Sequence, residues 1–198
     1  MIDASLSTIT TLSLILSPAN GNDKTLQCLS QLRLLHLQYL TFSADPVSPH
    51  SPYFTRFLVE HPSLRYLHLP GHESLLERSE MTLGMLPQLN SVSGFLPNLT
   101  ALADKCDSLK FVRSLVLLFP TDRTDEDLDA RVQEFLEFLG PVSSLKHCTI
   151  RNIFNIPTMV NVLQKFHYAF SEVEWWTLDC YYRNHLHLVS KLHFFIPE

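Results

Sequence analysis

Glycine is scarce in this chain, with five residues among 198. Loops that hold the phosphates of nucleotides need closely spaced glycines, because only glycine lets the backbone approach a phosphate group. The sequence contains neither the Walker pattern nor the dinucleotide-binding pattern, and it lacks the Gly-x-Ser-x-Gly elbow of serine hydrolases. We therefore expect no phosphate-binding loop of these types and no catalytic elbow.

Cysteine is also sparse, and its four copies lie far apart without a Cys-x-x-Cys pair: Cys28, Cys106, Cys148 and Cys180. Such spacing forms neither a zinc ribbon nor a dense disulfide framework. It predicts reduced, buried thiols and a protein of the cytoplasm or nucleus.

Long hydrophobic runs and clusters of basic residues are missing as well. No run reaches the roughly 18 apolar residues that a membrane-spanning helix needs. The apolar segment 9–16 is preceded by Asp3 and by no positive charge, which argues against a secretory signal. The net charge of −5 and the absence of a basic cluster predict no nucleic-acid partner and no membrane partner.

Histidine is plentiful, with ten residues, and the densest group is His185, His187 and His193. Two histidines two positions apart on a strand face the same way, as zinc ligands sometimes do. A closed zinc site needs four ligands, however, and no Cys, Asp or Glu stands at a matching spacing. We expect no metal, no cofactor and no catalytic residue, and we keep a hydrolase or metal protein only as a third hypothesis.

What the chain does contain is a recurring triplet, apolar-x-x-apolar-x-apolar. Apart from the last interval of 16 residues, successive copies begin 23 to 33 residues apart, which is mostly the interval expected when each repeat contains one strand and one helix. The strong copies are Ile9-Leu12-Leu14, Leu32-Leu35-Leu37, Leu64-Leu67-Leu69, Val112-Leu115-Leu117, Leu145-Cys148-Ile150, Val173-Trp176-Leu178 and Val189-Leu192-Phe194, and a weaker copy is Leu89-Val92-Gly94.

The triplet predicts an α/β fold. Side chains of a strand alternate between its two faces, so the last two apolar positions of each copy point to the same side. One unit cannot bury its own apolar face, whereas stacked units can. The sequence therefore predicts one leucine-rich-repeat-like domain over residues 1–198, a curved solenoid with parallel strands on one side and helices on the other. The second strand is expected at residues 34–39. The short last interval favours an antiparallel terminal hairpin.

If the triplets point inward, the residues between them line the opposite, concave side. This row mixes polar and aromatic side chains, and Tyr, Trp and Arg are the types that dominate binding energy at protein interfaces. The predicted partner-binding residues are His36, Gln38, Tyr66, His68, His147, Thr149, Arg151, Trp175, Thr177 and Asp179.

The segments 29–37 (LSQLRLLHL), 62–69 (PSLRYLHL) and 142–150 (VSSLKHCTI) resemble irregular leucine-rich repeats, and more narrowly the divergent repeats that follow the F-box in fungal F-box proteins. Two features depart from that pattern. The usual Asn or Cys three residues past each strand is missing. We therefore do not expect the ladder of buried hydrogen bonds that these side chains form with the loop backbone in regular repeats. The helical F-box also has no counterpart ahead of the first triplet, so the resemblance implies a repeat region without the ligase-docking module.

The resulting prediction is a non-enzymatic protein-binding module. The resemblance implies, more narrowly, the substrate-recognition repeats of a ubiquitin-ligase adaptor. The alternative from another class is a truncated or degenerate repeat protein that has no specific partner.

Overall fold

The computed structural model describes residues 8–16, 22–44, 52–71, 75–119, 125–142, 144–153, 156–170, 172–181 and 189–195. Strands and helices alternate through most of this chain. The elements are β1 (Thr11–Leu16), α1 (Asn22–Leu29), β2 (Tyr39–Ala44), α2 (Pro52–Val59), β3 (Tyr66–Leu69), the 3₁₀ helix η2 (Arg78–Glu80), β4 (Ser91–Phe95), α3 (Leu96–Lys105), the 3₁₀ helix η3 (Asp107–Phe111), β5 (Ser114–Leu118), α4 (Asp125–Leu139), β6 (His147–Ile153), α5 (Ile156–Ala169), β7 (Trp175–Tyr181) and β8 (Val189–Phe195).

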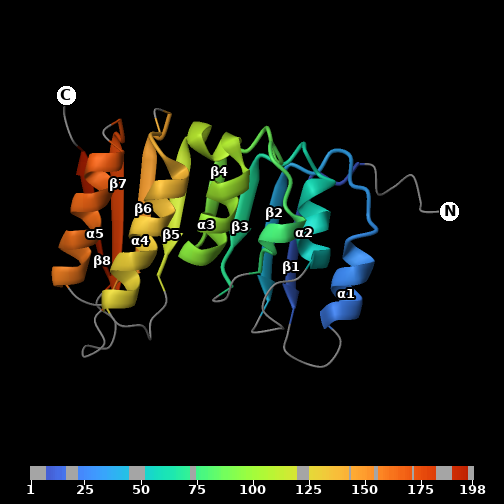
Figure 1. The fold of residues 1–198 in the computed structure, drawn as a ribbon, viewed down its shortest axis with the longest axis horizontal. Helices are drawn as coiled ribbons and strands as arrows, with labels where there is room; N and C mark the ends of the chain where they lie inside the picture. Colours follow the sequence, from blue (N-terminus) through green and yellow to red (C-terminus); the bar gives the residue numbers. More distant parts are fainter. Residues whose placement is uncertain are drawn as a thin grey trace.

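The strands form a single open sheet whose spatial order is the order of the chain, from β1 to β8. Strands β1 to β7 pair in parallel, and β8 pairs antiparallel with β7. Helices α1 to α5 lie together against one face of this sheet (Figure 1). The predicted α/β class, the separation of strands from helices and the terminal antiparallel pairing are confirmed. No helix among the described residues is long and apolar enough to cross a bilayer.

A repeated backbone contact joins each strand to its predecessor. The carbonyl of Gln38 accepts the N–H groups of both Arg65 and Tyr66, each at 2.9 Å. The same arrangement recurs at every parallel step, so that the strands start level with one another along the sheet. The accepting carbonyls belong to Thr10, Gln38, Arg65, Asn90, Arg113 and Lys146.

The predicted triplets form the core beneath the helices. Leu64, Leu67 and Leu69 are buried, and so are the corresponding residues of the three other strong copies that follow in parallel strands. Ile9, Leu12 and Leu14 of the first copy are only partly buried, because β1 is the edge strand. The side chains of the final triplet, Val189-Leu192-Phe194, lie outside the described residues. The buried sets are Leu64-Leu67-Leu69, Leu89-Val92, Val112-Leu115-Leu117, Leu145-Cys148-Ile150 and Val173-Trp176-Leu178.

The predicted position of the second strand is wrong. Strand β2 begins at Tyr39 rather than at residue 34, and Leu35 is 70% exposed. The buried triplet is Leu37-Leu40-Phe42, which has the same spacing as the predicted one but starts five residues later. The leucine-rich run allows both registers, and local spacing cannot choose between them. Pairing of β2 with β3 selects the later triplet, because Tyr39 pairs with Tyr66.

Serine hydroxyls supply part of the support for the loops between repeats. Ser63 lies directly before its triplet, and its Oγ donates to the Leu37 carbonyl at 2.8 Å. Ser144 occupies the same place in a later repeat and donates to the Val112 carbonyl at 3.2 Å. In each case the acceptor is the first triplet residue of the preceding repeat. A side-chain link between neighbouring repeats therefore exists, although the usual Asn or Cys is absent.

Gly94 stands where the weak copy should have its third apolar residue. A Cβ at this position would lie 3.3 Å from both the Cβ and the carbonyl oxygen of Leu69, and 3.7 Å from Leu99 Cδ2. Leu99 belongs to α3, which begins immediately after β4 without a connecting loop. The glycine thus leaves room for this helix to pack closely against the sheet.

His61 is a buried histidine that joins α2 to the turn before β2. Its Nε2 accepts the Leu34 N–H at 3.0 Å, so Nδ1 carries the proton and donates to the Phe57 carbonyl. Burial lowers the pKa of His61. The neutral imidazole therefore satisfies one buried donor and one buried acceptor.

We expect Gly94→Leu, which completes the triplet, to destabilise the protein. The added side chain would overlap Leu69 and displace Leu99, and overpacking of this kind costs about 1–3 kcal/mol. Urea unfolding measures the change, with Gly94→Ala expected to give a smaller loss of the same sign. An increase in stability for Gly94→Leu would contradict the close packing of α3.

The free energy of unfolding is expected to fall as the pH drops below about 6.5, where a histidine of the unfolded chain takes up a proton. His61 stays neutral in the folded protein to lower pH, so protons favour the unfolded chain by up to about 1.4 kcal/mol per pH unit. Urea titrations at several pH values should show a shallower dependence in His61→Gln. His36→Gln, at an exposed histidine, is the control, and equal slopes for His61→Gln and the wild type would contradict this assignment.

Candidate binding surface

The sheet face opposite the helices carries rows of side chains that run across the strands; we call it the open face. Because the parallel register is continuous, one residue of each strand stands beside its counterpart on the next strand. The first row is Thr11, Tyr39, Tyr66, Ser91, Ser114, His147 and Trp175. The second row is Ser13, Thr41, His68, Ser93, Val116, Thr149 and Thr177.

Two tyrosines form an aromatic platform at β2 and β3. The rings of Tyr39 and Tyr66 stack with centroids 4.3 Å apart and planes inclined by 3°. Tyr39 remains 42% exposed. Partial desolvation and then the Tyr66 hydroxyl raise the pKa of Tyr39, and the charge of Arg65 opposes this shift. The platform offers a flat apolar surface beside a positive charge.

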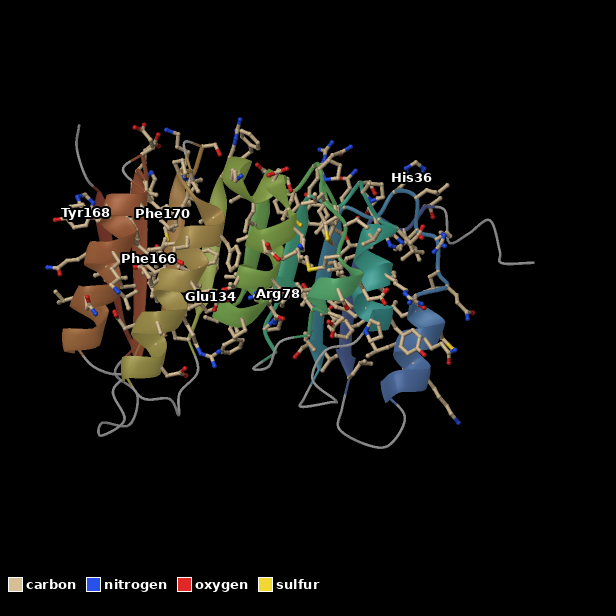
Figure 2. All side chains as sticks on the ribbon, viewed as in Figure 1. His36, Arg78, Glu134, Phe166, Tyr168 and Phe170 are labelled. Carbon is tan, nitrogen blue, oxygen red and sulfur yellow. The ribbon has the colours of Figure 1, made fainter. Side chains whose placement is uncertain are left out.

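Sequence reasoning missed Tyr39 because the second repeat was placed in the wrong register. Aligning Leu37-Leu40-Phe42 with Leu64-Leu67-Leu69 puts Tyr39 beside Tyr66, and the sequence contains this triplet as well as the predicted one. The same correction moves two predicted residues. His36 lies in the turn before β2, away from the sheet face (Figure 2), and Gln38 precedes the strand and contributes its carbonyl to the backbone ladder.

The structure brings the other predicted residues together on β3, β6 and β7. Tyr66 and Trp175 belong to the first row, separated by Ser91, Ser114 and His147, and Trp175 is 46% exposed. Asp179 pairs in register with Arg151, but its side chain lies outside the described residues. The predicted residues placed on the open face are Tyr66, His68, His147, Thr149, Arg151, Trp175 and Thr177.

Small side chains occupy the middle of the open face. Ser91 and Ser93 of β4 stand beside Ser114 and Val116 of β5, between the tyrosine platform and the His147–Trp175 end. Ser93 Oγ is buried and has no hydrogen-bond partner in the described structure. Burial, and then the charge of Arg151, lower the pKa of His68, so this neighbour of Ser93 is a neutral imidazole near neutral pH.

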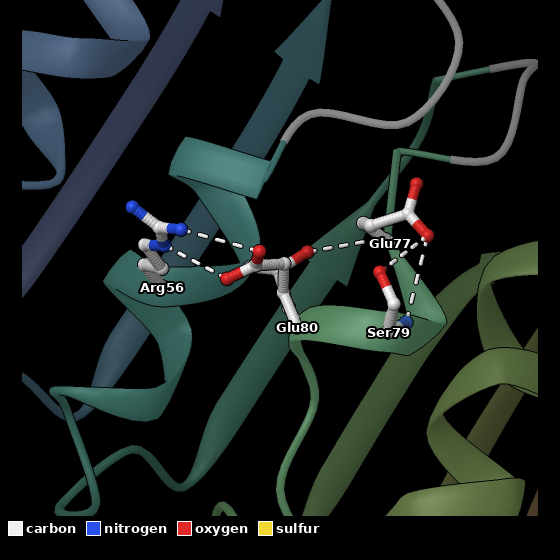
Figure 3. Close-up of polar contacts among 5 residues, drawn as sticks. Arg56, Glu77, Ser79 and Glu80 are labelled. Carbon is white, nitrogen blue, oxygen red and sulfur yellow. Dashed lines mark hydrogen bonds and ion pairs between the residues drawn. The ribbon is translucent and has the colours of Figure 1, made fainter.

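Charges divide between the two sides of the sheet. In the helical layer, acidic residues pair with basic ones of the same layer. Arg56 of α2 holds Glu80 through two bonds of 2.8 and 3.2 Å, next to the Glu77–Ser79 contact (Figure 3). These bonds hold the pKa of Glu80 below its usual value. Further pairs are Arg78–Glu134, Arg131–Asp127 and Lys165–Asp129.

The strand side of the sheet has a different charge distribution. Among the described side chains of β1 to β7 none is acidic. Arg65 and Arg113 are exposed at the strand starts, directly before Tyr66 and Ser114 of the first row, and neither forms an ion pair within the described residues. Lys146 follows at the same level and pairs with Glu174 at 2.7 Å. The border of the open face is therefore positive, although the whole chain has a net charge of −5.

A groove of about 560 Å³ lies on the helical side, between η2, α3 and α4. Its ionic side chains pair with one another. Arg78 lies 3.0 Å from Glu134 (Figure 2). Arg131 lies 3.1 Å from Asp127. The groove contains neither histidine nor cysteine. The charges of these side chains are therefore neutralised locally.

The thiols and histidines form no reactive cluster in the part of the chain that is described. No group of three or more His, Cys, Asp or Glu there could hold a metal ion. Cys106 and Cys148 are free and buried, whereas Cys28 is exposed, so the prediction of buried thiols is wrong for Cys28. Burial raises the pKa of Cys106 to about 12, and it raises the pKa of Cys148 as well. The candidates His185 and His187, and the side chain of His193, lie outside the described residues.

We expect alanine substitutions at Ser93 and Ser63 to change the free energy of unfolding in opposite directions. Ser93→Ala removes a buried hydroxyl that has no partner, and we expect a gain of about 0.5–1 kcal/mol in the free energy of unfolding. Ser63→Ala removes the bond to the Leu37 carbonyl, and we expect a loss of about 1 kcal/mol. Urea unfolding of both variants measures the two changes, and a clear loss of stability for Ser93→Ala would contradict its unpaired state.

Comparison of the chain with protein-family models, with curated proteins and with solved structures finds no match. What the open face can bind must therefore be derived from its own side chains. They offer aromatic area at two places, hydroxyl groups between them and positive charge along one border.

Proposed function

We propose that this chain is a non-enzymatic protein-binding module, a short curved solenoid of leucine-rich-repeat type that holds an extended segment of a partner protein along its open face. The observation that supports this proposal best is the first row of the open face. It crosses seven strands without interruption and carries large aromatic side chains near both ends, at Tyr39 and Tyr66 and again at Trp175.

The residue types favour binding of a protein. Tyrosine and tryptophan bury large areas at little cost in conformational entropy, and they dominate the energetics of protein interfaces. The stacked Tyr39–Tyr66 pair is already ordered, so a partner need not fix these side chains. Small residues between the two aromatic ends leave space for a backbone to lie close to the sheet.

The narrower role is the substrate-recognition region of a ubiquitin-ligase adaptor in the cytoplasm or nucleus. Its support is the resemblance of segments 29–37, 62–69 and 142–150 to F-box-associated repeats. The free, buried thiols of Cys106 and Cys148 agree with a reducing compartment.

The open face can be tested by crosslinking pull-down from an extract of the source organism. Tyr66→Ala, Arg151→Ala and Trp175→Ala together should abolish capture of a specific partner, since they remove the aromatic area and one positive charge. The control combines Lys24→Ala, Leu83→Ala and Tyr168→Ala, which are exposed residues outside the strands, and it should capture the partner at wild-type level.

Circular dichroism and urea unfolding must show that both triple variants remain folded. Capture that survives in the open-face variant would place the binding site elsewhere. A wild-type protein that captures nothing specific would instead favour a degenerate repeat protein without a partner.

A further inference from the structure

We propose that the occupant of the open face is an acidic, extended peptide segment whose carboxylates contact Arg65 and Arg113 and whose apolar side chains contact the Tyr39–Tyr66 platform and Trp175. This inference rests on the proposed function and adds the chemistry of the partner. Two observations support it, the distribution of charges around the sheet and the separation of the aromatic residues in the first row.

The charge argument begins with the helical layer. Arg56, Arg78, Arg131 and Lys165 are each held by a carboxylate of the same layer. Surface pairs of this kind contribute little stability, but they neutralise the charges involved. Apart from the exposed Lys24 of α1, the described cations of the helical side are therefore compensated by nearby carboxylates, and this side attracts an acidic partner less than the border of the open face does.

Arg65 and Arg113 are the opposite case, because within the described residues no carboxylate holds them. Both are exposed and stand at the same level of the sheet, two strands apart, which corresponds to about 10 Å. The Asn90 between them is neutral. Guanidinium groups bind carboxylates through paired hydrogen bonds. Two carboxylates three residues apart in a polyproline II segment lie on one face about 9 Å apart and would match this separation.

The distance between the aromatic residues sets the length of the bound peptide. Tyr66 on β3 and Trp175 on β7 are separated by four strand steps, or about 19 Å. An extended chain covers that distance in about six residues. Ser91 and Ser114 lie between them and can donate hydrogen bonds to a peptide carbonyl. The implied ligand has an apolar residue near each end and acidic residues in between.

A peptide fits this face better than a nucleic acid does. The described border carries only two unpaired cations, and the whole chain has a net charge of −5, whereas tight binding to a phosphate backbone uses many cationic contacts. Two carboxylates need no more than two cations. A single-stranded oligonucleotide is therefore the competing occupant that the experiment must include.

The test is to pan a random peptide library displayed on phage against the purified full chain. We expect the selected peptides to be enriched in Asp and Glu between apolar residues. Fluorescein-labelled copies should bind Arg65→Glu/Arg113→Glu at least about tenfold more weakly than wild type, with weaker binding at higher salt. Arg65→Lys/Arg113→Lys keeps both charges but cannot form the paired hydrogen bonds, so its affinity should lie between those of the wild type and the charge reversal.

A second control distinguishes an effect of the charges at Arg65 and Arg113 from an effect of the net charge of the protein. Lys24→Glu/Lys165→Glu changes the net charge by the same amount on the helical side, and it should bind like the wild type. If this control weakens binding as much as the charge reversal at Arg65 and Arg113, or if a fluorescein-labelled oligothymidine binds more tightly than the selected peptides, the inference is overturned.

The remaining outcomes distinguish the inference from the proposed function. Peptides without acidic enrichment that lose binding in Tyr66→Ala/Trp175→Ala would overturn the acidic ligand and leave the open face as the binding site. Selection of no peptide, or of peptides that bind all of these variants equally, would overturn both. Circular dichroism of every variant confirms that it is folded.

Discussion

The structure depends on one backbone contact that is repeated along the sheet. In each parallel step a single carbonyl accepts two successive N–H groups of the next unit, beginning with Thr10 and continuing to Lys146. Because every unit is docked at the same point, the strands start level and equivalent residues stand side by side. A shift of one residue at any step would turn the triplet of that strand toward solvent.

This common register separates the two faces of the sheet. The triplets meet beneath the helices and form one core, while the residues between them form rows on the open face. The charges separate in the same way, because the helices carry most of the described acidic residues and Arg65 and Arg113 stand at the strand starts. The backbone ladder thus produces both the stability of the fold and the surface on which we place binding.

Local departures from the repeat have structural reasons of their own. Gly94 occupies a core position because α3 follows β4 directly and approaches the Leu69 backbone. His61 joins the end of α2 to the turn before β2 by accepting the Leu34 N–H and donating to the Phe57 carbonyl. Each departure occurs where a helix or turn of one unit contacts the neighbouring unit, and a pattern of apolar residues carries no information about such contacts.

The sequence by itself determined the α/β class, the helix-covered core and most of the open face, because spacing of three and then two residues specifies which side chains share a side of a strand. Tyr66, His68, His147, Thr149, Arg151, Trp175 and Thr177 follow from that spacing. Only the tertiary structure decided the register of β2, since the leucine-rich run offers two triplets five residues apart and pairing with β3 selects the second. Through that choice it placed Tyr39 on the open face and His36 off it. It also decided which cations are neutralised, because ion pairs join residues that are distant in sequence, such as Arg78 and Glu134.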